Sequence, residues 1–249
     1  MPVERCPTGV PSIDALLGGG LEMDCLTELY GEGGSGKTLL CIEVAVRLAL
    51  ADRWVFYIDT EGVSVDRLEA VAGGKIDRVL HRLLLSTPRN IEEQTRAVET
   101  AASLTREGRR PVGLIVLDSA TFYYRLSLSG PDEEGTRIAL ASELAELLAT
   151  ALAAQVPVVF TNQVWRRPSD GSLEPLGGSF VNHAAKTILR LDRLAGPRRR
   201  AVLVKHRSLG EGSADFEIGP TGLGSGPGPP RPAPSRPGLP GPSTRSASG

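Results

Sequence analysis

The feature that most restricts the fold of this sequence is a glycine-rich octapeptide. It reads Gly31-Glu32-Gly33-Gly34-Ser35-Gly36-Lys37-Thr38, after a predicted strand at Leu26–Tyr30 and before an apolar helical pattern at Thr38–Leu50. It matches GxxxxGK[ST] at every fixed position and in the required strand–loop–helix context. Small residues let the backbone wrap around phosphates, and the backbone N–H groups and the helix N-terminus then face the anion. The octapeptide therefore predicts a phosphate-binding loop rather than a chance glycine-rich turn.

The loop also assigns roles to individual residues. Lys37 is expected to reach the β- and γ-phosphates, and the Thr38 hydroxyl to bind magnesium. Leu39 continues the nucleotide-binding segment into the helix. ATP and Mg²⁺ are thus the predicted cofactors, and ATP hydrolysis the predicted activity.

Strands and helices alternate along most of the chain, which predicts an α/β fold with a mostly parallel sheet and helices on both faces. The first predicted helix is short and is capped by Ser12. At the C-terminal end, the pattern predicts an antiparallel pair of strands, with Arg198-Arg199-Arg200 in a turn before that pair. The predicted strands are Leu26–Tyr30, Trp54–Ile58, Val112–Leu117, Val156–Thr161, Thr187–Asp192, Ala201–His206 and Ala214–Ile218. The predicted long helices are Thr38–Leu50, Ile91–Glu107 and Ile138–Ala154.

Polar residues follow three of these strands, where parallel sheets bind ligands. Asp118 ends an apolar strand in the Walker B pattern and is expected to hold magnesium directly or through water. Glu61 is expected to polarise the attacking water, the alternative being a turn cap, and Asp59 to be structural. Gln163 is expected to sense the γ-phosphate and couple it to the following loop, the alternative being a turn-forming Asn-Gln pair.

Composition divides the chain in two. Nineteen of the 26 residues in 224–249 are Gly, Pro or Ser, which predicts a disordered tail after a single domain at 1–223. The net charge is −1 overall and about −4 without the tail, so a strongly basic DNA-coating protein is excluded. Cys6, Cys25 and Cys41 have neither metal-ligand nor disulfide spacing and are expected to be buried. With no signal peptide and no membrane-length apolar run, we expect a cytoplasmic protein.

The motifs, in this order, resemble the RecA/RadA recombinase core. The resemblance rests on TGVPSIDALLGGGLE, YIDTEG, LDS and TNQV, and it covers about residues 8–222. Tyr124-Arg125, Val204-Lys205-His206-Arg207 and the absence of an N-terminal domain resemble the archaeal RadB paralogues in particular. The resemblance implies a RecA-like core, weak ATP hydrolysis, and a role in DNA recombination and repair that assists a RadA-type recombinase.

The sequence also departs from full recombinases. Only seven residues precede Thr8, so the helix-hairpin-helix domain and the Phe-x-x-Ala segment that links recombinase subunits into filaments are expected to be missing. The loop after Gln163 is compact, with 12 residues from Trp165 to Leu176. Autonomous strand exchange is therefore the second functional hypothesis, and a KaiC-like regulatory ATPase acting on a protein partner is the third.

Two loops are candidates for modest binding of single-stranded DNA. Arg125 lies in the loop after Asp118, with Tyr123 and Tyr124, and Arg166-Arg167 follow Trp165. Aromatic rings can stack on bases while guanidinium groups meet phosphate. The alternatives are solvated arginines and at least one tyrosine packed beneath its loop.

The end of the domain carries a further candidate site. Lys205 and Arg207 are expected to share a strand face, with His206 opposite, and to act in trans on the ATP of a neighbouring subunit of a homo-oligomer. A solvated strand edge and contact with DNA phosphate are the alternatives.

Overall fold

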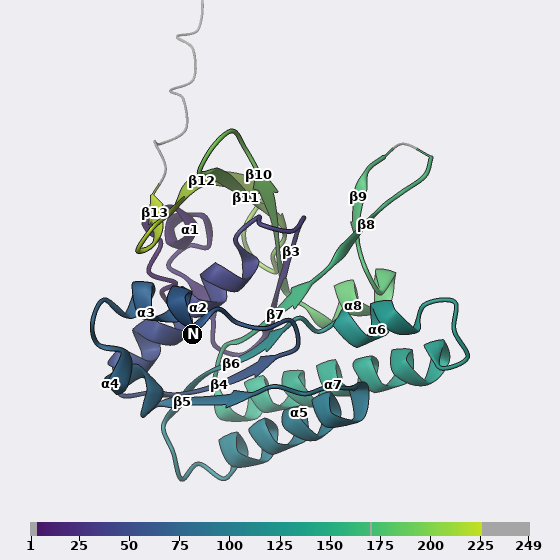
Figure 1. The fold of residues 1–249 in the computed structure, drawn as a ribbon, viewed down its shortest axis with the longest axis horizontal. Coiled ribbons are helices and arrows are strands. Elements are labelled where there is room, and N and C mark those ends of the chain that lie inside the picture. Colours follow the sequence, from purple (N-terminus) through teal and green to yellow (C-terminus); the bar gives the residue numbers. More distant parts are fainter. Residues whose placement is uncertain (1–3, 170, 226–249) are drawn as a thin grey trace, which may run out of the picture.

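The computed structural model describes residues 4–169 and 171–225. A nine-stranded sheet in the order β13-β12-β11-β10-β3-β7-β6-β4-β5 forms its centre, with helices on both faces (Figure 1). The strands from β10 to β5 run parallel, whereas β10 to β13 pair antiparallel with one another. The predicted α/β fold class is confirmed, and the C-terminal antiparallel set has a third strand, β13, that the sequence did not predict.

The helices follow the predicted order, with four short additions, α3, α4, α6 and α8. Their bounds are α1 Pro11–Leu16, α2 Lys37–Leu50, α3 Val65–Ala72, α4 Ile76–Leu80, α5 Ile91–Arg106, α6 Phe122–Ser127, α7 Glu133–Ala154 and α8 Gly178–Ala184.

Two small antiparallel pairs accompany the main sheet: β1 with β2, and β8 with β9. The N-terminal strands are β1 Arg5–Cys6, β2 Leu21–Glu22, β3 Leu26–Tyr30, β4 Trp54–Asp59, β5 Leu83–Ser86 and β6 Val112–Asp118. The C-terminal strands are β7 Val158–Asn162, β8 Val164–Arg166, β9 Leu173–Pro175, β10 Thr187–Arg193, β11 Arg198–Lys205, β12 Gly212–Gly219 and β13 Gly222–Ser225.

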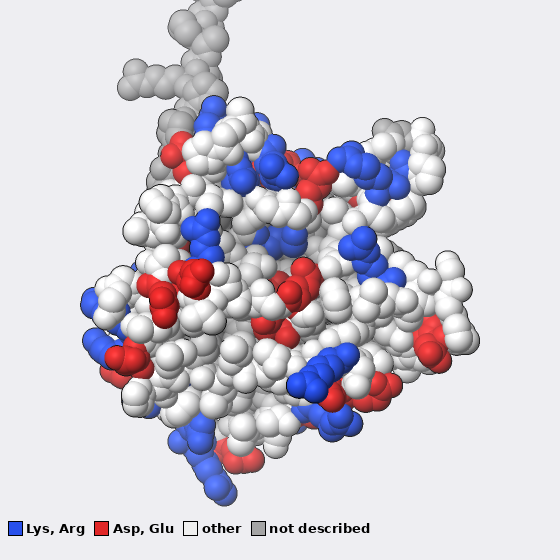
Figure 2. Space-filling model, in the orientation of Figure 1, with Lys and Arg blue, Asp and Glu red and all other residues white. Residues whose placement is uncertain are grey.

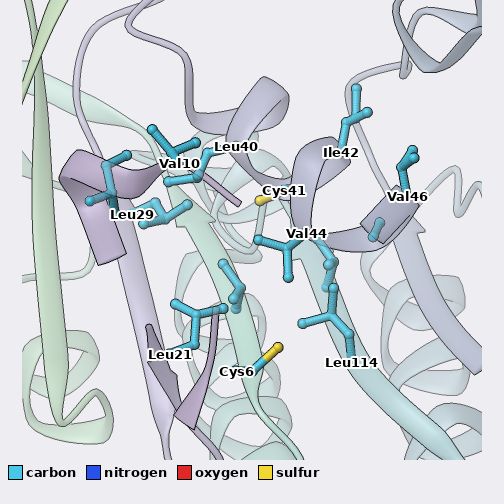
Figure 3. Close-up of a cluster of buried hydrophobic side chains, with 14 of the residues drawn as sticks. Cys6, Val10, Leu21, Leu29, Leu40, Cys41, Ile42, Val44, Val46 and Leu114 are labelled. Atoms are coloured by element: carbon cyan, nitrogen blue, oxygen red, sulfur yellow. The ribbon is translucent and has the colours of Figure 1, made fainter. Parts of the chain in front are cut away.

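The alternation of side chains along the strands creates two separate cores. In β4, Val55 and Tyr57 pack with α2, α3 and α4, whereas Phe56 and Ile58 pack with α5 and α7. Figure 3 shows part of the first core, where Leu40 of α2 lies near Leu29 of β3. Cys6, Cys25 and Cys41 are buried and unpaired, as predicted.

Three local predictions are wrong. Helix α1 begins at Pro11, a favoured first helical residue, so Ser12 lies inside the helix and does not cap it. Arg198-Arg199-Arg200 begin strand β11 instead of forming a turn, because pairing with β12 continues to Arg198. Strand β13 extends two residues past the predicted domain end, since Gly224 and Ser225 pair with β12.

Residues 226–249, most of the predicted tail, lie outside the described residues. Within 4–169 and 171–225, none of the helices combines the length and apolar character that crossing a membrane requires.

Candidate nucleotide site

The loop between β3 and α2 has a backbone that only glycine permits at two positions. Gly31 has φ of 150°, and a Cβ there would lie 2.2 Å from the carbonyl oxygen of Leu191. Gly36 has φ of 102° immediately before helix α2 begins at Lys37. The close approach of β10 and the left-handed turn thus account for these glycines, and together they aim the helix N-terminus at the loop.

The side chain of Lys37, the first residue of α2, folds back over the loop. The Lys37 ammonium donates to the carbonyl oxygens of Gly31 at 2.8 Å and Glu32 at 3.2 Å. Burial lowers the pKa of Lys37, while the negative charges of Glu61 and Asp118 oppose that shift. A cation held over the loop by backbone carbonyls can exchange them for phosphate oxygens.

Asp118 is the buried acid at the end of β6. Its carboxylate accepts hydrogen bonds from Tyr57 Oη at 2.8 Å and Thr161 Oγ1 at 2.5 Å. Burial raises its pKa, and hydrogen bonds from Thr161, Tyr57 and Thr38 oppose the rise. The contact with Thr38 brings the two predicted magnesium ligands together.

This pair of ligands fits a magnesium ion that completes its shell with nucleotide oxygens and water. Hydroxyl and carboxylate oxygens are hard ligands of the kind Mg²⁺ prefers. No group of three or more His, Cys, Asp or Glu side chains in the described ranges could hold a metal by itself.

Glu61 and Asp59 occupy different positions at the end of β4, and only Asp59 holds the turn. The Asp59 carboxylate accepts from the backbone N–H groups of Glu61, Gly62 and Val63 at 2.6 to 3.2 Å, and so it shapes the turn after β4. The Glu61 side chain is exposed and lines a cavity beside the glycine-rich loop instead of capping that turn.

These residues surround one cavity of about 260 Å³. Its lining residues from the loop and strand ends are Gly33, Gly34, Gly36, Lys37, Thr38, Leu39, Glu61 and Asp118. Three more, Arg67, Thr161 and Ile218, were not predicted. They come from α3, β7 and β12, and only Thr161, one residue before Asn162 at a strand end, had a signal in the sequence.

Gln163 joins the cavity to helix α6. Its Nε2 donates to Glu61 Oε1, and its Oε1 accepts from Arg125 Nη1 at 3.1 Å. Tyr124 of the same helix is buried, as predicted for one of the tyrosines, while Tyr123 Oη donates to the carbonyl oxygen of Pro88. The first candidate DNA loop therefore contacts the candidate catalytic acid through one amide.

The second candidate DNA loop is the β8–β9 hairpin, which projects from the body of the molecule (Figure 1). Arg166 pairs with Glu32 of the phosphate-binding loop, and Arg167 pairs with Glu174. Trp165 is 44% exposed. In Figure 2, Lys and Arg side chains occupy the rim of this face over the hairpin and the β10–β12 region, with acidic side chains nearer its centre.

Lys205 and Arg207 lie near the amino ends of the parallel strands, whereas this cavity lies at their carboxyl ends. Lys205 Nζ donates to the carbonyl oxygens of Asn182 and Ala185 at the end of α8. Arg207 pairs with Asp24 and with the buried Glu22, at the amino end of β3. The predicted shared face does not form, because β11 ends at Lys205 and His206 also turns toward Glu22, at 3.6 Å.

Comparison with known proteins places this geometry in a family. Residues 3–225 match the Rad51 family. The chain is 40% identical to the DNA repair and recombination protein RadB of Methanoculleus marisnigri over 224 residues, which cover 90% of this chain and 99% of that protein. It is 38% identical to RadB of Methanococcoides burtonii over 222 residues, 88% of this chain and 97% of that protein. A crystal structure of the RadB recombinase superposes with a TM-score of 0.76 at 32% identity, covering 90% of this chain and all of that chain.

Proposed function

Since the chain belongs to the Rad51 family and is a RadB-like DNA repair and recombination protein, we propose that it binds ATP with Mg²⁺, hydrolyses ATP slowly, and assists a RadA-type recombinase on single-stranded DNA. The family finding favours recombination over the KaiC-like alternative. Strand exchange by this chain alone is the second candidate.

The observation that carries the ATPase proposal is the meeting of four predicted side chains in one cavity. Lys37 and Thr38 begin α2, Glu61 follows β4 and Asp118 ends β6, and all four line it. A cation for the γ-phosphate, oxygen ligands for magnesium and a carboxylate for the attacking water are the parts that ATP hydrolysis requires. When bound, magnesium would neutralise phosphate charge; the protein residues bind the nucleotide and accept a proton.

The test uses two variants with matched controls. Lys37→Ala is expected to weaken ATP binding in calorimetric titrations at least about tenfold, because the variant loses the phosphate cation. Lys75→Ala changes an exposed lysine at the start of α4 and serves as its control. Glu61→Gln is expected to bind ATP normally and lose hydrolysis, with exposed Glu69→Gln as its control. Unchanged ATP binding by Lys37→Ala would refute the site.

The DNA proposal rests on the exposed arginines of two loops. Arg125 lies on α6, and Arg166 and Arg167 lie on the β8–β9 hairpin beside the exposed Trp165. The pairs of Arg166 and Arg167 with glutamates are at least a third exposed, so solvent screens them and phosphate can compete for the arginines. A ring beside guanidinium groups suits stacked bases and phosphates of a single strand.

A salt-resolved titration with single-stranded DNA tests this proposal, with and without ATP. Arg166→Gln and Arg167→Gln are each expected to weaken binding and reduce the salt slope by about 1, whereas Arg109→Gln, an exposed arginine of another surface loop, should leave both unchanged. Strand exchange measured alongside separates the two recombination hypotheses. If neither hairpin variant changes the binding of single-stranded DNA, the assignment of the β8–β9 hairpin to DNA contact is refuted.

The proposed partner site is the free edge of the sheet at β5. A groove of about 430 Å³ adjoins this strand and the face of α5, and its apolar lining includes Phe56, Ile58, Leu84 and Ala97. Strand β5 pairs only with β4 in the described sheet, so its other edge can accept an extended segment while the groove takes an apolar side chain. We assign this surface to an extended segment of the RadA-type recombinase.

Substitutions at the groove test the partner assignment. Ala97→Glu is expected to weaken binding to the purified recombinase about tenfold or more, since a charge would be buried on docking. Leu80→Glu makes the same charge change at an exposed apolar residue of α4, outside the groove, and should have no effect. Equal binding by both variants would place the partner elsewhere.

A further inference from the structure

Three side chains connect the surface helix α6 with the nucleotide cavity. The guanidinium of Arg125 donates to Gln163 Oε1 at 3.1 Å, and Gln163 Nε2 donates to Glu61 Oε1. Arg125 is exposed on α6, and Glu61 lines the cavity. The basic end of this connection is therefore open to a ligand, and the acidic end faces the nucleotide.

The two charged ends fix the orientation of the amide between them. A guanidinium has donors only, and an ionised carboxylate has acceptors only. Gln163 satisfies both only with its oxygen toward Arg125 and its nitrogen toward Glu61. The reversed amide would place its NH₂ group against the guanidinium and its oxygen against the carboxylate. Arg125 thus determines which group Glu61 meets.

The backbone at Gln163 is held independently of Arg125. Its N–H donates to Thr121 Oγ1 at 3.1 Å, and the Thr121 hydroxyl donates to the buried Asn162 Oδ1 at 2.8 Å. A change at Arg125 can consequently release the Gln163 side chain without displacing the end of β7. Arg125 forms no ion pair with an acid of its own chain among residues 4–169 and 171–225, so an external anion meets no such competitor.

We propose that Arg125 is a positioning residue that restrains hydrolysis: through Gln163 it keeps an amide N–H on the Glu61 carboxylate, and an anion that engages Arg125 lifts the restraint. A carboxylate oxygen that accepts this N–H is not free to take the proton of the attacking water. A hydrogen bond from guanidinium to phosphate is stronger than one to a neutral amide, so a DNA phosphate can draw Arg125 away. The inference rests on the proposed roles of Glu61 in hydrolysis and of α6 in DNA contact.

The deciding measurement is the steady-state hydrolysis of ATP by the full chain without DNA. Arg125→Gln is expected to raise kcat about fivefold, equivalent to about 1 kcal/mol, with the KM for ATP unchanged. Single-stranded DNA should then add little further stimulation. Arg125→Lys keeps a cationic donor and should restore the low rate. Arg137→Gln removes an exposed arginine that pairs with Glu134 and is the matched control.

The outcomes separate this inference from the function on which it rests. A kcat for Arg125→Gln at or below that of the parent, with Glu61→Gln inactive, overturns the restraint and leaves the ATPase site intact. Hydrolysis by Glu61→Gln at the parent rate overturns the catalytic assignment itself. A raised kcat that Arg125→Lys does not reverse would show that charge at this position has no part in it, which also refutes the proposal. Melting temperatures establish that every variant is folded.

Discussion

Asn162 is a buried residue that ties both candidate DNA loops to the core, and its replacement by leucine gives a demanding test of the structure. Its Nδ2 donates to Glu28 Oε1 at 2.8 Å and to the carbonyl oxygen of Leu176 at 2.9 Å. Its Oδ1 accepts from the Thr121 hydroxyl at 2.8 Å. Leucine has a similar shape, so the substitution removes three hydrogen bonds with little change in packing.

The expected loss in the free energy of unfolding is at least about 3 kcal/mol, because each buried group left without a partner costs about 1–3 kcal/mol. Thr121→Val removes the hydroxyl of one partner and should cost about 1–2 kcal/mol. Urea unfolding at constant m-value measures both losses. A loss below about 1 kcal/mol for Asn162→Leu would refute this description of the core.

The pH dependence of the same variant provides a second measure. Burial raises the pKa of Glu28 from 4.5 to about 7, and the hydrogen bond from Asn162 and the charge of Lys205 oppose the rise. The folded state therefore binds the Glu28 proton more tightly than the unfolded state does. The contribution of Glu28 to the free energy of unfolding is complete below pH 4.5 and falls by at most about 3 kcal/mol as the pH rises through 7.

Without Asn162 the pKa of Glu28 should rise further, so the fall in stability should continue to a higher pH and become larger in total than in the parent. Burial also raises the pKa of Glu143 to about 7. Since Glu143 titrates in both proteins, the difference between their pH profiles isolates Glu28. Parallel pH profiles would contradict the Glu28–Asn162 contact.

Three further predictions concern Asp118 at the candidate nucleotide site, Arg207 near the amino ends of the strands, and residues 226–249. Asp118→Asn should raise the Mg²⁺ concentration needed for half-maximal ATP binding about tenfold or more, as seen in magnesium titrations; an unchanged requirement would exclude Asp118 as a ligand. If Arg207 acts in trans, specific ATPase activity rises with protein concentration, and Arg207→Lys, which keeps a cation near Glu22, flattens that rise; concentration-independent activity would exclude the role. Truncation after Ser225 should leave the melting temperature and ATP affinity nearly unchanged, because residues 226–249 are too poor in apolar residues to add a core; a fall of several degrees would show otherwise.

Local patterns in the sequence determined most of the fold and the residues of the nucleotide loop. Continuous apolar runs identified the long strands, because strands of a parallel sheet are buried on both faces. The helical spacing of apolar residues identified the long helices. Gly31 and Gly36 could be assigned because the backbone they permit is a property of the residue itself. Asp118 and Glu61 could be placed beside the loop because the carboxyl ends of parallel strands meet on one side of the sheet.

Contacts between distant segments were decided only by the tertiary structure. Arg67 and Ile218 reach the nucleotide cavity from α3 and β12, and no pattern near either residue indicates a nucleotide. Strand β11 begins at Arg198 because β12 pairs with it, although three consecutive arginines look like a turn. Whether Arg207 meets a carboxylate of its own chain depends on how β11 ends beside Glu22. Burial and backbone geometry are encoded locally and can be read along the chain, whereas the partner of a long charged side chain depends on where the fold brings the other charges.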